Sequence, residues 1–308
     1  SGMPGADSSL QKAGQWLLSK EVRHYGDWAL KCKVDEPSGW YFQYANEFYP
    51  DTDDSAAVLM ALQRVSLPER MHKEKAVLRG LKWLLAMQCD DGGWGAFDRN
   101  NNKAILNHIP FADFNALLDP STSDVTGRCL DFLGRIGFSK SSHHIQKAID
   151  YLQKEQEKDG SWFGRWGANY IYGTWSVLSG LSAAGEDMNK PHIKRAVAWL
   201  KSVQNSDGGW GETIKSYDDP FLKAIGKSTS SQTAWALLGL MTADEVECDA
   251  VERGIKFLLS KQKEDGSWDE IEFTATGFPK VFYLKYHMYR NYFPLMALGR
   301  YRNLIQKA

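Results

Sequence analysis

The chain has 308 residues, a mass of 34.8 kDa and a formal net charge of −1. This near-neutral charge argues against a nucleic-acid partner, and no run approaches the roughly 20 apolar residues that cross a bilayer. The four cysteines have neither metal-type nor disulfide-like spacing, which favours a cytoplasmic location. We expect residues 1–2 to be a tag remnant and residues 3–308 to form one complete domain.

One pattern recurs five times: a basic residue, a small residue, an aromatic–aliphatic pair, then Gln and a Gly-x-Trp turn. The clear copies span residues 79–94, 147–162, 195–210 and 253–268. A weaker copy spans residues 12–28 and carries Glu21 where the others carry Gln. Apolar residues at helical spacing before an Asp/Gly-rich turn predict a helix that ends at that turn. We expect the Gln amide to bond backbone groups at a neighbouring helix end while the Trp packs over them.

Further apolar segments between the copies predict a second set of helices. They cover residues 55–65, 125–136, 175–184 and 229–241. Helix pairs repeating about every 50–70 residues predict stacked αα-hairpins. The expected fold is all-α: a single αα-toroid (an α/α barrel) whose inner helices line a central cavity. The absence of a Gly-rich phosphate loop and of alternating strands argues against a nucleotide-binding α/β fold.

An acidic motif, Asp51-Thr52-Asp53-Asp54, precedes the helix predicted over 55–65. A lone aspartic acid, with a pKa of about 4, is ionised at neutral pH and cannot donate a proton. Carboxyl groups packed together cannot all ionise, so one of them keeps its proton. The alternative is a helix N-terminal cap, and Asp54 is a candidate for that role even if the cluster is also an acid.

The repeats and the segment 49–56 together resemble the squalene-hopene cyclase family of class II terpene cyclases. The resemblance runs from about residue 10 to residue 301. It includes the segments 26–28, 39–40, 95–98, 107–111, 164–167, 277–279 and 288–290. The family usually has a second barrel, so this sequence is most similar to the single-domain cyclases of meroterpenoid pathways. The resemblance implies polycyclisation of a lipophilic prenylated substrate such as geranylgeranyl-dihydroxybenzoate, without cofactor or metal.

The resemblance also assigns the acid. Asp53 is implied to be the proton donor, assisted by Asp51 and Asp54 and supported by Asp124. The family has a His four residues after that last aspartate, where this chain has Arg128. A permanent cation favours ionised carboxylates. One expectation is that Arg128 pairs with Asp124 or Asp51 and leaves Asp53 protonated; the alternative is an ordinary exposed arginine on a helix.

A cavity that carries a cation needs aromatic faces, and 13% of this chain is aromatic. The resemblance implies that the lining rings are Phe42, Trp94, Phe97, Phe114, Trp166, Phe278, Phe282, Tyr286 and Tyr289. Residues 278, 282, 286 and 289 recur at a spacing compatible with one helical face. Segment 108–114 is similar to the family's channel constriction, with Phe111 and Ala112 as its gate. Taken singly, each ring is more often a residue of the packed core than one that lines a cavity.

Several alternatives stay open. The substrate could be squalene or another linear polyprenyl chain. A protein prenyltransferase β subunit shares the toroid but needs zinc ligands, and a class I terpene synthase needs a DDxxD-type motif; the sequence shows neither. A non-enzymatic toroid that acts as a binding module would not need the acidic motif. Residues 217–225 mix apolar and basic groups, which suggests peripheral membrane contact. The oligomeric state is not predicted.

Overall fold

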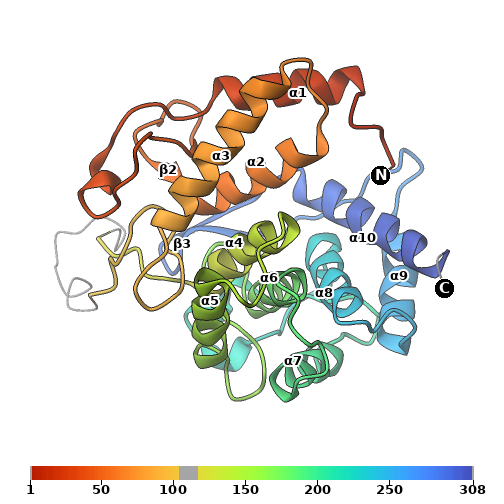
Figure 1. The fold of residues 1–308 in the computed structure, drawn as a ribbon. Helices are drawn as coiled ribbons and strands as arrows, with labels where there is room; N and C mark the ends of the chain where they lie inside the picture. Colours follow the sequence, from red (N-terminus) through yellow and green to blue (C-terminus); the bar gives the residue numbers. More distant parts are fainter. Residues whose placement is uncertain (1, 104–116, 307–308) are drawn as a thin grey trace.

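The computed structural model describes residues 2–103 and 117–306 (Figure 1). Within these ranges the chain forms ten α-helices and two short antiparallel strand pairs. The helices are α1 (Ser8–Ser19), α2 (Thr52–Arg64), α3 (Arg70–Ala86), α4 (Ser123–Arg135), α5 (His143–Lys154), α6 (Tyr170–Ala183), α7 (Pro191–Ser202), α8 (Ser230–Thr242), α9 (Asp249–Lys261) and α10 (Tyr289–Ile305). The strand pairs are β1 (Trp40–Tyr41) with β2 (Pro50–Asp51), and β3 (Ala275–Phe278) with β4 (Phe282–Leu284).

The helices alternate between an outer and an inner layer. Helices α6 and α8 are buried around their whole circumference, whereas α5, α7 and α9 bury only one face. Helix α2 packs on α4, α4 on α6, α6 on α8, and α8 on α10. Figure 1 shows α4, α6 and α8 in the middle, with α5, α7 and α9 around them. The predicted αα architecture is therefore confirmed, and the four predicted second helices correspond to α2, α4, α6 and α8.

Glycines bring two inner helices into backbone contact. A Cβ on Gly127 of α4 would lie 2.7 Å from the backbone of Ser176 on α6, and one on Gly180 would lie 2.4 Å from the carbonyl oxygen of Gly127. Both distances are below van der Waals contact, so a larger residue at either position would push α4 and α6 apart. This close contact holds together the two helices that carry Arg128 and Tyr172.

The repeat tryptophans end the outer helices by hydrogen bonding as well as by packing. Each of the four clear copies donates its indole N–H to a carbonyl in the last turn of the preceding outer helix. The bonds are Trp94 to Leu84 (2.8 Å), Trp162 to Leu152 (2.7 Å), Trp210 to Leu200 (2.8 Å) and Trp268 to Leu258 (2.8 Å). Carbonyls at a helix C-terminus lack helical partners, so these bonds satisfy buried acceptors.

The repeat glutamines tie each outer helix to the next one. The amides of Gln88, Gln156 and Gln204 donate to the carbonyl of the second residue of the following outer helix. The acceptors are His144 (3.0 Å), His192 (2.7 Å) and Ala250 (2.9 Å). The expectation that Gln bonds a neighbouring helix end is thus confirmed for these three copies, whereas the amide of Gln262 in the fourth copy donates to the carbonyl of Gly266 in its own turn.

The basic residue of the pattern has a partner that sequence reasoning missed. Arg195 donates to the side-chain oxygen of Gln156, one repeat earlier, at 2.6 Å. Arg79 of the second copy forms an ion pair with Glu21 of the weaker first copy, with a shortest N–O distance of 2.6 Å. Glutamate therefore replaces glutamine in that copy without loss of the link between repeats.

The prediction that Trp94 lines the cavity is wrong. Trp94 is fully buried in the core, and its indole is bonded to Leu84. The Trp94→Phe variant should lower the free energy of unfolding by about 1–3 kcal/mol, because the buried carbonyl of Leu84 loses this partner. Urea unfolding measures that loss. An unchanged free energy of unfolding would contradict this structural role.

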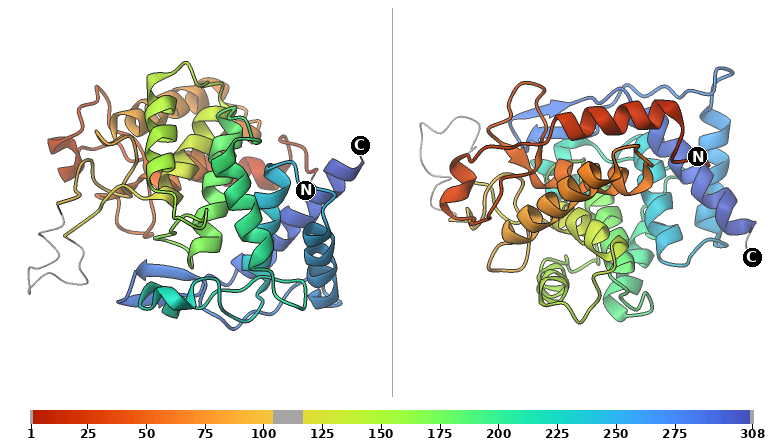
Figure 2. Two further views of the ribbon diagram at one scale, coloured as in Figure 1. Left: turned by 90° about the horizontal axis from the view of Figure 1, so that it is seen from below. Right: turned by 45° about the horizontal axis from the view of Figure 1, so that its top comes forward.

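The prediction of one helical face over residues 278–289 is also wrong. Phe278 and Phe282 lie on the β3–β4 hairpin, which Figure 2 shows at one end of the helices, and α10 begins only at Tyr289. The turn contains Pro279, which has no backbone N–H for a helix, and Lys280 with φ of 70°. The rings therefore have helical spacing in the sequence by coincidence, because they belong to a hairpin and to the start of the helix that follows it.

Candidate active site

A cavity of about 1070 Å³ opens at the N-terminal ends of α2, α6 and α10. This volume is slightly above the 300–1,000 Å³ that small-molecule sites usually occupy. Seven of the predicted rings line it: Phe42, Phe97, Trp166, Phe278, Phe282, Tyr286 and Tyr289. Trp28, Tyr172 and Tyr292 line it as well, although sequence reasoning did not select them.

Three carboxyl groups, Asp51, Asp53 and Asp54, line the same cavity at the start of α2. Asp51 is the N-cap of this helix, because its Oδ1 accepts the backbone N–H of Asp54 at 2.9 Å. The proposal that Asp54 forms the cap is therefore wrong. Thr52 holds the motif in place through its hydroxyl, which donates to the carbonyl of Gly95 at 2.7 Å.

Burial makes this cluster hold protons. Burial, followed by the charges of Asp54 and Asp53, raises the pKa of Asp51 well above its ordinary value. Burial, followed by the charge of Asp53, raises the pKa of Asp54 from 3.8 to about 7, although the cation of Arg128 opposes this rise. The cluster therefore keeps protonated carboxyl groups near neutral pH, as expected of packed carboxyl groups.

Arg128 pairs with the middle carboxylate. Its Nε lies 3.0 Å from Oδ1 of Asp53, and its Nη2 donates to the hydroxyl of Tyr172 at 3.2 Å. Its guanidinium carbon also lies 5.4 Å from the ring centroid of Trp175. Burial lowers the pKa of Arg128, but Asp53 and Tyr172 outweigh burial and leave that pKa raised. The expectation that Arg128 pairs with Asp124 or Asp51 is wrong.

Asp124 is occupied elsewhere. Its Oδ2 accepts the backbone N–H of Trp166 at 2.8 Å, so it positions the segment that carries this cavity ring. Asp119 acts in the same way on the neighbouring segment, because its carboxylate accepts the backbone N–H groups of Ala96, Phe97 and Asp98 at 2.6–3.1 Å. Sequence reasoning missed Asp119 because a lone aspartate in a loop belongs to no motif.

The chain matches a family model described as the squalene-hopene cyclase C-terminal domain over residues 1–303. It belongs to the squalene-hopene cyclase family. It is 49% identical over 306 residues to the squalene–hopene cyclase of Alicyclobacillus acidocaldarius, covering 99% of this chain and 48% of that protein. It is 52% identical over 296 residues to the squalene-hopene cyclase of Schizosaccharomyces japonicus, covering 96% of this chain and 45% of that one. The chain thus spans about half the length of these relatives.

Among solved structures, the type II terpene cyclase MstE from Scytonema has a similar fold. The TM-score is 0.63 at 18% identity, covering 95% of this chain and 81% of that one. At this identity the likeness concerns the fold alone. It supports the αα-barrel assignment for this member of the squalene-hopene cyclase family.

Some predicted features of this family member remain predictions. Phe111, Ala112 and Phe114 lie outside the described residues, so the gate is untested. In the loop 217–225, Tyr217 is buried while Phe221 is 90% exposed. Contact of this loop with a bilayer stays a prediction that co-sedimentation with lipid vesicles would test. None of the helices in the described part is long and apolar enough to span a membrane.

Proposed function

We propose that this chain catalyses a class II cyclisation, in which a carboxylic acid protonates an alkene of a folded isoprenoid chain. The observation that carries the proposal is the placement of three carboxyl groups, clustered at the start of α2, on the wall of a cavity that is rich in aromatic rings. The described helices would act as one catalytic domain, and Asp53 would be the donor. Membership of the squalene-hopene cyclase family and 49% identity to a squalene–hopene cyclase support this activity.

Asp53 would donate the proton, and the groups beside it would support that donation. The guanidinium of Arg128, whose Nε lies 3.0 Å from Oδ1 of Asp53, would balance the negative charge that donation leaves on that carboxyl group. Asp51 and Asp54, whose pKa values are raised by burial, hold protons beside it.

The rings would stabilise the cation as it moves away from the acid. Trp166 contacts Phe97 and Phe278, with ring centroids 6.0 and 6.1 Å apart, and Phe42 contacts Tyr286 at 6.0 Å. Aromatic faces attract a cation without adding to it as a nucleophile would. Proton loss, or capture by a nucleophile within the substrate, would end the cascade.

Two substrates are candidates, and a specific observation favours each. Relatives about 50% identical to this chain are named squalene–hopene cyclases, which favours squalene. MstE, which the chain covers to 82%, is solved with geranylgeranyl dihydroxybenzoate as substrate and with merosterolic acid A as product. This favours a prenylated aromatic acid for a barrel of similar size. Sequence identity is far higher for the first group, so we rank squalene first, ahead of the prenylated aromatic acid expected from the sequence.

The test is to incubate the purified chain separately with squalene and with geranylgeranyl dihydroxybenzoate, to separate products from substrate by chromatography, and to identify them by mass spectrometry and NMR. We expect cyclised isomers, of unchanged mass, from one of the two. Absence of cyclised product from both, together with no effect of Asp53→Asn on any measured activity, would contradict the proposed function.

Turnover should depend on pH through the acid cluster. The protonated form is the active one, so turnover should be constant below about pH 7, where Asp54 titrates, and fall above it. The folded pKa of Asp54 lies above its ordinary 3.8, so its contribution to stability is fully present below about pH 4 and is lost as pH rises to about 7. Turnover and urea unfolding measured from pH 4 to 9 check both trends. Asp54→Asn should flatten the stability trend, and an unchanged trend would contradict the assignment.

A further inference from the structure

The cavity ring Trp166 belongs to a short segment, residues 164–168, that lies outside the helices and strands and is fixed by hydrogen bonds. Asp124 accepts the backbone N–H of Trp166 at 2.8 Å. The backbone N–H of Thr276 on β3 donates to the carbonyl of Trp166 at 3.2 Å. These two bonds fix the backbone of Trp166 itself and leave the residues on either side of it to other partners.

Tyr217 supplies the hydrogen bond on either side of Trp166. It is the last residue of the short 3₁₀ helix Ile214–Tyr217. Its hydroxyl lies 2.6 Å from the carbonyl oxygen of Gly164 and 2.8 Å from that of Gly167. A phenol has one proton, so the hydroxyl donates to one of these carbonyls at a time. Both glycines are buried, and no other hydrogen bond reaches either carbonyl within the described part of the chain.

The ring of Tyr217 is anchored separately from its hydroxyl. Its centroid lies 5.6 Å from that of Phe163 and 5.9 Å from that of Tyr283 on β4. Figure 2 shows the 3₁₀ helix next to the β3–β4 hairpin. Tyr217 is 4% exposed and does not line the large cavity. It therefore acts on a substrate only through the groups that it holds.

We propose that Tyr217 is a positioning residue whose hydroxyl holds Trp166 where its ring stabilises the later cations of the cyclisation. This inference rests on the proposed function and concerns how far the cascade runs, not the acid that starts it. An aromatic face attracts a cation only within about 6 Å of the ring centroid. Without the hydroxyl, the carbonyls of Gly164 and Gly167 lose their donor, and the segment shifts toward other partners. A cation that is no longer stabilised by Trp166 loses its proton early and gives a product with fewer rings.

The test compares Tyr217→Phe with the wild type on whichever substrate the wild type cyclises. Phenylalanine keeps the ring contacts with Phe163 and Tyr283 but has no hydroxyl. The ratio of products with fewer rings to the main wild-type product should rise about tenfold, because small displacements at a reacting centre have large effects. Chromatography separates the products, and NMR counts their remaining double bonds, since each ring closure consumes one.

This ratio distinguishes positioning from a general structural role. Only folded enzyme makes product, so a smaller folded fraction lowers both kinds of product alike and leaves their ratio unchanged. A double-mutant cycle adds a second distinction. Trp166→Leu should raise the ratio by itself, and adding Tyr217→Phe to it should change the ratio by less than about twofold further, because the ring that Tyr217 positions is already gone.

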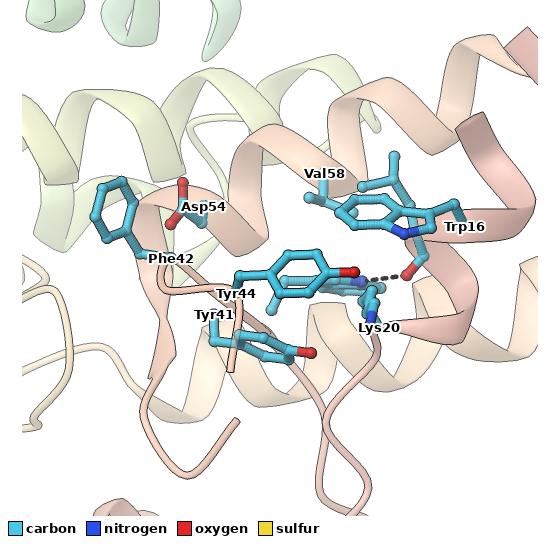
Figure 3. A pocket seen from close by; sticks show the side chains of 9 residues that line it. Trp16, Lys20, Tyr41, Phe42, Tyr44, Asp54 and Val58 are labelled. Carbon is cyan, nitrogen blue, oxygen red and sulfur yellow. Dashed lines mark hydrogen bonds between the residues drawn. The ribbon is translucent and has the colours of Figure 1, made fainter. Parts of the chain in front are cut away.

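Two control variants remove a tyrosine hydroxyl elsewhere. Tyr170 contacts the same ring, Phe163, at 5.7 Å, but its hydroxyl makes no hydrogen bond with the described residues. Tyr41 lines a smaller pocket together with Asp54, and Figure 3 shows its hydroxyl pointing away from that carboxyl group. Tyr170→Phe and Tyr41→Phe should both keep the product ratio within about twofold of the wild type.

The outcomes separate the two proposals. No cyclised product from the wild type contradicts the proposed function. Wild-type product with an unchanged ratio in Tyr217→Phe, or with an equal shift in either control, overturns the positioning role alone. Additive effects of Tyr217→Phe and Trp166→Leu also overturn it, because Tyr217 would then act through another group.

Discussion

Replacing Asp53 by asparagine is expected to lower turnover by about 10³-fold or more, because the amide has nearly the same shape but no acidic proton. The variant should stay folded. Asp53 makes one ion pair, and Arg128 keeps its contacts with Tyr172 and Trp175. Product formation by mass spectrometry and thermal unfolding of the purified variant check both expectations.

A matched control lies in the same cavity. Asp98 also lines it, but its carboxylate accepts a bond from the side chain of Asn101 and lies outside the acid cluster. Asp98→Asn should keep turnover within about threefold of the wild type. Equal losses in the two variants would show that any carboxyl group in the cavity matters, and would remove the special role of Asp53. A non-enzymatic binding module would keep its ligand affinity in both.

The fold was predictable because each repeat contains local sequence signals for its own helix and turn. Helical spacing, a turn glycine and a Trp recur together, so the outer helices could be placed without knowledge of tertiary contacts. Gly92 and Gly160 show why the turn needs glycine: both have φ near 100°, and a Cβ would clash with the backbone of the next repeat. Local rules of this kind can be read from a single sequence.

The errors arose where one residue type serves two purposes. Trp94 is an aromatic residue of the kind that could line a cavity, but it lies at the end of an outer helix. Its hydrogen bond to the carbonyl of Leu84 identifies it as a structural residue. The rings at 278 and 282 have helical spacing, yet Pro279 and the turn place them on a hairpin. Spacing alone cannot distinguish these cases when a chain is rich in aromatic residues.

The electrostatic partner of Arg128 could not be predicted for a different reason. From the sequence alone, Asp51, Asp53 and Asp124 are all candidate partners for Arg128 on α4. Which of them pairs with it depends on which already has another hydrogen-bond partner. Asp124 binds the backbone of Trp166, and Asp51 caps α2, so Asp53 is the carboxylate left for the cation. Competition among acceptors is a property of the assembled fold.

Replacing Arg128 by leucine should therefore change both the rate and the pH dependence of the reaction. Without the cation, the negative charge that donation leaves on Asp53 has no ion-pair partner, so turnover should fall by about 10²-fold. The cation also opposes the rise in the pKa of Asp54, so its loss raises that pKa further. The pH above which turnover falls should move upward by about one unit or more, as expected for removal of a nearby opposite charge. Turnover measured from pH 5 to 10 tests both effects.

Arg135→Leu is the control for this substitution, because Arg135 lies on the same helix and pairs with Asp131 away from the cavity. It should leave rate and pH dependence unchanged. Arg128→His restores the residue that the family resemblance implies here, and it should recover turnover below about pH 6.5, where imidazole carries a charge. A loss of rate in Arg128→Leu without any movement of the pH dependence would mean that Arg128 only supports the fold of α4. Movement of the pH dependence together with recovery by histidine would establish that the positive charge at position 128 acts on the carboxyl cluster.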